Sequence, residues 1–159
     1  MMNKIFTVLI FTALLSASYS VNANYIPKLS LDEKVKTSDI IFIGKVISID
    51  SEPIGKYQQK YAVVKITKSL YGIQGIKQIK VLFDGPISEL NPLCCEIGFN
   101  YLFMLKKYKD DYYETSNGPY GIYKIDSSYI YGWDHPEYKE KTLLIDAINQ
   151  IEELIRGMN

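Results

Sequence analysis

The chain has 159 residues, with 18 basic and 18 acidic side chains and therefore no formal net charge. This balance argues against the broad basic surface of nucleic-acid-binding proteins, so we expect no nucleic-acid partner. The length suits one domain with a hydrophobic core large enough to need no disulfide framework.

The first 23 residues have the pattern of a secretory signal peptide. Lys4 supplies a positive charge, an apolar run extends over the 11 residues from Ile5 to Leu15, and small residues lead to Ala23. A membrane-spanning helix needs about 20 apolar residues. We therefore expect cleavage after Ala23, export to the periplasm or the extracellular space, and no transmembrane segment afterwards. Residues 24–159 would form a single domain with 17 basic residues, after loss of Lys4, against 18 acidic ones, a net charge of −1.

Helix and strand signals alternate with turn residues in the first two thirds of the chain. Ser30 and Glu33 form a capping-box pattern that predicts a short helix over about Leu31 to Thr37. Gly44 lies inside an apolar run and predicts a bulge or bend there. Four strands are predicted, at Asp39–Ile49, Tyr57–Ser69, Lys77–Phe83 and Asn100–Tyr108.

The last third combines a short strand with a helix. Tyr112–Thr115 follows a turn as a fifth strand, Asn117–Pro119 breaks it, and Gly121–Ile125 is predicted to resume it. From about Tyr138 to Arg156, the spacing of apolar residues predicts an amphipathic helix, with Leu143, Leu144, Ala147, Ile148, Ile151, Leu154 and Ile155 on its apolar face. Five strands with one long terminal helix indicate a mainly β (α+β) domain rather than a βαβ layout.

Three segments share a pattern with a known family. Ser38–Val46 contains an Asp, an apolar run, a Gly and a Lys-Val pair; Val64–Gly72 contains a strand and an aromatic-Gly turn; Cys95–Phe103 contains a Cys, a Gly and a Tyr-Leu pair. In this order and spacing they resemble the netrin-like domain, the OB-fold family of the tissue inhibitors of metalloproteinases, which includes bacterial members. The resemblance covers roughly residues 30–125.

The resemblance implies a five-stranded antiparallel OB-like barrel with a short N-terminal helix and a C-terminal helix packed against it. In the metalloproteinase inhibitors, an N-terminal Cys chelates the zinc of the enzyme. Here Asn24 is the expected N-terminus and no cysteine precedes Cys94, so this mechanism is not carried over.

Cys94 and Cys95 are the only cysteines, and they are adjacent. Neighbouring Cα atoms lie about 3.8 Å apart, closer than the usual 4.4–6.8 Å of a disulfide. Three interpretations stay open: buried reduced thiols, a vicinal disulfide, and an intermolecular bridge or redox-reactive thiol. Without nearby His or further Cys the pair is no convincing zinc site, and no metal or cofactor is expected.

His135 is the single histidine of the chain. No Gly-x-Ser-x-Gly element or other nucleophile motif accompanies it. Pro136 favours an extended or turn conformation at His135, so a structural or solvent-facing loop residue is the simpler interpretation.

Tyr129, Tyr131 and Trp133 alternate along the chain, which places them on one face of an extended segment. The face could pack on the sheet or under the helix, or it could form an exposed contact surface, because Tyr and Trp are enriched among interface hot spots. With His135, these residues are the predicted binding site.

Two functions follow as hypotheses. The first is an exported binding module, inhibitor-like or an envelope interaction domain, that recognises a protein or glycan. The alternative is a small exported enzyme that uses His135 or the Cys94 and Cys95 pair. The lack of catalytic motifs favours the binding module over an enzyme.

Overall fold

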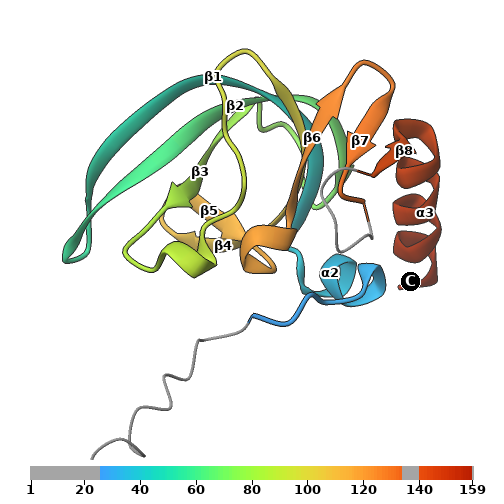
Figure 1. Ribbon diagram of the computed structural model, residues 1–159, viewed down its shortest axis with the longest axis horizontal. Coiled ribbons are helices and arrows are strands. Elements are labelled where there is room, and N and C mark those ends of the chain that lie inside the picture. The colour runs from blue at the N-terminus through green and yellow to red at the C-terminus, as the bar shows by residue number, and fades with distance from the viewer. Residues whose placement is uncertain (1–25, 134–139, 159) are drawn as a thin grey trace, which may run out of the picture.

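The computed structural model describes residues 26–133 and 140–158 (Figure 1). The expected signal peptide and His135 lie outside these residues. The two helices are α2 (Leu31–Thr37) and α3 (Leu144–Gly157). The strands are β1 (Ile40–Ile54), β2 (Tyr57–Tyr71), β3 (Gln78–Asp84), β4 (Asn100–Lys109), β5 (Tyr112–Thr115), β6 (Ile122–Asp126), β7 (Tyr129–Tyr131) and β8 (Lys141–Leu143), with single 3-10 turns η1 (Ser88–Leu90) and η2 (Gly118–Tyr120).

All eight strands belong to one mixed sheet in the order β1-β2-β3-β5-β4-β6-β7-β8. A further pairing of β1 with β4 joins β1, β2, β3, β5 and β4 into a closed ring, from which β6, β7 and β8 continue the sheet.

The expectation of five antiparallel strands is wrong in two respects. The sheet has eight strands rather than five, since it also contains β6 and the short strands β7 and β8, of 3 residues each. The sheet is mixed because β3 and β5 pair in parallel. An antiparallel pairing reverses the strand direction, so an odd ring of five strands cannot close with antiparallel pairings alone.

The two N-terminal sequence signals are confirmed. Ser30 caps α2: its backbone N–H donates to Glu33 Oε2 at 2.9 Å, and the Glu33 N–H donates to Ser30 Oγ at 3.3 Å. The register between β1 and β2 shifts at Gly44. A Cβ atom on Gly44 would lie 2.6 Å from Val64 Cγ1, so the bend needs a residue without a side chain.

The two larger of three apolar clusters among the described residues lie on the two faces of the sheet. Side chains alternate along β4, so Tyr101, Phe103 and Leu105 belong to one cluster and Leu102 and Met104 to the other. The first cluster, which we call the ring cluster, consists mainly of residues from the closed ring of strands. The second lies beneath α2 and α3, which cover the end of the sheet opposite the long β1–β2 hairpin (Figure 1).

Helix α3 packs against the sheet as predicted, with Ala147, Ile148 and Ile151 buried. It begins at Leu144, later than predicted, because Lys141–Leu143 are extended and pair with β7 as β8. Leu143 therefore does not belong to the apolar face of the helix, and its side chain is exposed. No described helix is both long and apolar enough to span a membrane.

Candidate binding groove

The predicted aromatic face is only partly formed. Tyr129 is exposed and Tyr131 half-buried, but Trp133 is only 2% exposed. Strand β7 ends at Tyr131 and Gly132 has a φ of 68°, so the chain turns and the alternation stops before Trp133.

Trp133 instead packs inward beneath α3. Its ring centroid lies 5.1 Å from that of Tyr123, and its Nε1 donates a hydrogen bond to Gln150 Oε1 at 3.0 Å. The expectation of one exposed face with three aromatic rings is thus wrong for Trp133, and packing under the helix is the correct interpretation of that residue.

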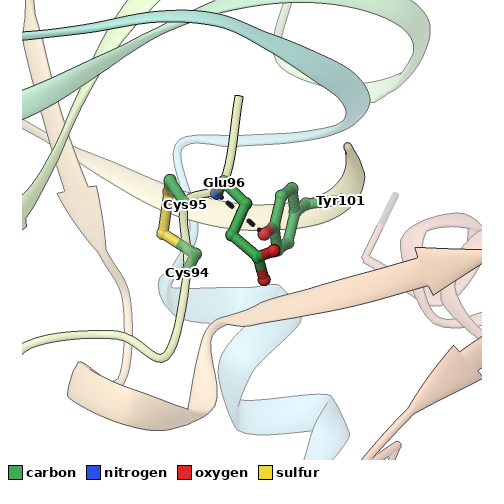
Figure 2. The surroundings of a disulfide bond; sticks show 4 residues. All are labelled: Cys94, Cys95, Glu96 and Tyr101. Carbon is green, nitrogen blue, oxygen red and sulfur yellow. Dashed lines mark hydrogen bonds between the residues drawn. A yellow bond between two sulfur atoms is a disulfide. The ribbon is translucent and has the colours of Figure 1, made fainter. Parts of the chain in front are cut away.

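Cys94 and Cys95 are joined to each other by a disulfide, across a cis peptide bond (Figure 2). Of the three interpretations of the pair, the vicinal disulfide is the one present here, and no free cysteine occurs among the described residues. Cys95 is buried against the ring cluster, while Cys94 is half-buried.

The backbone after the disulfide is anchored at both of its ends. The Glu96 N–H donates to Tyr101 Oη at 2.9 Å (Figure 2). The Gly98 N–H donates to the Val46 carbonyl at 2.8 Å, and the Val46 N–H donates to the Phe99 carbonyl at 3.0 Å. The loop between β3 and β4 is therefore held against β1 and β4 where it re-enters the sheet.

This loop and the hairpin of β6 and β7 enclose an open cavity of about 500 Å³. We call it the 93–131 groove, and its lining residues are Leu93, Phe99, Ile122, Tyr123, Lys124, Asp126 and Tyr131. Of the predicted site residues that the structure describes, Tyr131 alone lines it; Tyr129, Trp133, Cys94 and Cys95 do not.

Most residues that line the groove are apolar or aromatic. Ile122 and Tyr123, at adjacent positions of β6, are each only 3% exposed. Leu93 and Phe99 come from the loop before β4 and are 63% and 43% exposed. Large apolar side chains exposed together on an anchored backbone are typical of interaction sites.

The charged groups at the groove are paired within the protein. Lys124 Nζ lies 2.6 Å from Glu96 Oε1 and 3.8 Å from the centroid of the Phe99 ring. The hydrogen bond to Glu96 raises the pKa of Lys124, so its ammonium group stays charged. Tyr131 Oη donates to Asp126 Oδ2 at 3.3 Å.

Lys141 adds a second ammonium group beside the groove. Its Nζ lies 5.3 Å from the ring centroid of Tyr131 and 5.8 Å from that of Tyr129. The hydrogen bond with Tyr131 raises the pKa of Lys141. Both lysines thus hold their charge next to aromatic rings, a favourable arrangement for each.

Sequence reasoning missed most of the groove. Leu93 and Phe99 are apolar residues in a loop that contains Pro92 and Gly98, and this composition indicates that their side chains are exposed. Nothing in the sequence connects this loop with Lys124 and Asp126, which lie on β6, the strand that pairs with β4.

The described residues contain no group of three or more His, Cys, Asp or Glu side chains placed to hold a metal ion. A second cavity of about 420 Å³ lies elsewhere on the molecule, and Ile87 and Leu90 are among the residues that line it.

No protein-family model matches the chain, and no curated protein matches its sequence.

Proposed function

We propose that this protein is an exported binding module whose 93–131 groove contacts a protein or a glycan. The observation that carries this proposal is the exposure of Leu93 and Phe99 beside a cavity of about 500 Å³. That volume falls in the range of ligand sites, about 300–1,000 Å³. Burying the two side chains under a ligand would remove apolar surface from water, which favours binding.

The proposal includes an OB-like barrel of the netrin-like type. The closed ring of five strands and the helix packed on its outer face support it, as does the similarity of the three sequence segments. OB-folds use their surfaces and loops to bind other molecules, which agrees with a binding role but does not by itself identify the ligand.

The test compares three forms of the mature protein as baits for components of the native envelope and culture fluid. They are the wild type, a Leu93→Ser/Phe99→Ser variant, and a Leu90→Ser control. Leu90 is a matched control because it is an exposed leucine on the same connection that lines the other cavity.

We expect a component that the wild type and the Leu90→Ser control retain and the Leu93→Ser/Phe99→Ser variant loses. Thermal melts of all three proteins verify that each is folded. If every retained component is held equally by the three forms, the groove is not the ligand site and the proposal fails.

A further inference from the structure

We infer that the ligand of the 93–131 groove is a polypeptide that inserts an apolar side chain, such as Leu or Phe, rather than a glycan. This inference rests on the proposed function and narrows its ligand class. It follows from which groups in the groove already have partners and which are left exposed.

The polar groups of the groove have partners within the protein. Lys124 is paired with Glu96, and Asp126 accepts a hydrogen bond from Tyr131. Tyr123 Oη accepts from Lys34 Nζ and donates to the Tyr120 carbonyl, both at 2.6 Å. A sugar needs several hydrogen bonds to its hydroxyl groups, and here it would have to compete with existing ones, which lowers the net gain.

The aromatic rings at the groove are also partly covered. Lys124 lies over Phe99, and Lys141 lies over Tyr131 and Tyr129. Each ring therefore has an ammonium group on one face. A sugar ring that stacks on that face would have to displace a favourable cation–π contact.

The aliphatic surface, in contrast, is open. Leu93 and Phe99 line the groove and are 63% and 43% exposed. Ile97, in the same loop but outside the lining, is 59% exposed. Aliphatic side chains offer a sugar no directional contact, but they favour another apolar side chain through removal of water from both. The exposed residues of this loop therefore favour a ligand that buries an apolar side chain against them.

The charges around this apolar centre are balanced. Glu96 and Asp126 are acidic, and Lys124 and Lys141 are basic. These internally partnered groups form a polar rim of both signs around an apolar centre, which is the usual anatomy of a protein interface. A polyanionic saccharide would meet two carboxylates in this rim, so the rim does not complement it.

The loop that carries Leu93 and Phe99 is held in place before a partner arrives. Between these two residues the chain contains the Cys94–Cys95 disulfide and Glu96, whose N–H donates to Tyr101 Oη (Figure 2). Because the backbone is already ordered, binding costs less conformational entropy than it would with a loose loop.

The experiment uses two sets of probes on the same immobilised mature protein. One is a phage-displayed library of random linear peptides, and the other is an array of oligosaccharides. Each is read with the wild type, Leu93→Ser and the Leu90→Ser control, after melts show that all three are folded.

We expect enriched peptides with a large apolar residue at a constant position. They should bind Leu93→Ser about tenfold or more weakly than the wild type, a loss of about 1.4 kcal/mol, and Leu90→Ser unchanged. Replacing the apolar peptide residue by Ser should also weaken binding. The losses of binding free energy from this change and from Leu93→Ser should not add, because the effects of mutating two residues in contact are not independent.

The other outcomes separate the inference from the proposed function. Oligosaccharides that bind in a Leu93-dependent way, without peptides or more tightly than peptides, overturn the inference and leave the binding module standing. The inference is also overturned if the enriched peptides show no preference for an apolar residue. It is likewise overturned if Leu90→Ser weakens their binding as much as Leu93→Ser does. Failure of both probe sets to bind in a Leu93-dependent way overturns the inference and the proposed function together.

Discussion

At the scale of single residues, burial decides the role of Trp133. Its neighbour two positions back, Tyr131, lines the groove, whereas Trp133 is enclosed between Tyr123 and α3. The turn at Gly132 explains why Tyr131 lies at the surface and Trp133 in the core, although only one residue separates them.

We expect Trp133→Ala to lower the free energy of unfolding by about 3–5 kcal/mol, because a large buried ring is lost and Gln150 loses its donor. Chemical denaturation measures this. Tyr129→Ala, at an exposed position of the same segment, is the control and should change stability by less than about 0.5 kcal/mol. A native-like Trp133→Ala would place the residue outside the core.

Tyr112 gives a prediction about pH. Burial, and then its hydrogen bond to Glu52, raise the pKa of Tyr112 above its ordinary value. Because the folded-state pKa is higher than the unfolded one, the neutral phenol stabilises the fold below about pH 10, and this contribution is lost as the pH rises further.

Tyr112→Phe removes this titration. The stability difference between wild type and Tyr112→Phe should be constant from neutral pH to about pH 9, then move in favour of the variant above about pH 10. Urea unfolding at a series of pH values measures the difference. A difference that is the same at all pH values would contradict the role of the Tyr112 phenol.

At the scale of elements, α3 is held by one face. Ala147, Ile148 and Ile151 are buried against the sheet, while Ile145 is 57% exposed. The helix therefore carries the same side chain at buried and exposed positions, so the exposed Ile145 is a control for substitutions of the buried isoleucines.

Ile148→Ala and Ile151→Ala should each cost about 2–5 kcal/mol of stability, because they leave cavities in the cluster beneath the helix. Ile145→Ala should change stability by less than about 0.5 kcal/mol. Thermal melts decide the matter: equal effects at the three positions would mean that α3 is not docked by this face.

At the scale of the whole molecule, export is a prediction from the first 23 residues. We expect N-terminal sequencing of the exported protein to begin at Asn24, because the charged, apolar and small-residue order directs cleavage after Ala23. Recovery of a soluble cytoplasmic protein that retains Met1 would contradict this.

The absence of a cysteine before Cys94 carries a second prediction at this scale. The mature protein should not inhibit zinc proteases by N-terminal chelation. The expected N-terminus has no cysteine, so no disulfide can hold the Asn24 amine in the position that chelation requires. Inhibition assays against several zinc proteases test this. Nanomolar inhibition that disappears when one residue is added before Asn24 would show the opposite.

By itself, the sequence determined the local features of this protein. The capping box at Ser30, the bend at Gly44, the position of β1 to β6 and the amphipathic face of α3 follow from spacing within a few residues. Such features depend on contacts near in the chain, where periodicity and turn residues carry the information.

Only the tertiary structure decided the features that depend on distant residues. The parallel pairing of β3 with β5 follows from ring closure. Lys34 of the short helix α2 is fully buried and hydrogen-bonded to Tyr123, 89 residues away. The groove likewise forms because the sheet order places β6 and β7 beside the loop that precedes β4. Residue spacing contains no record of these approaches, since they result from how the elements pack.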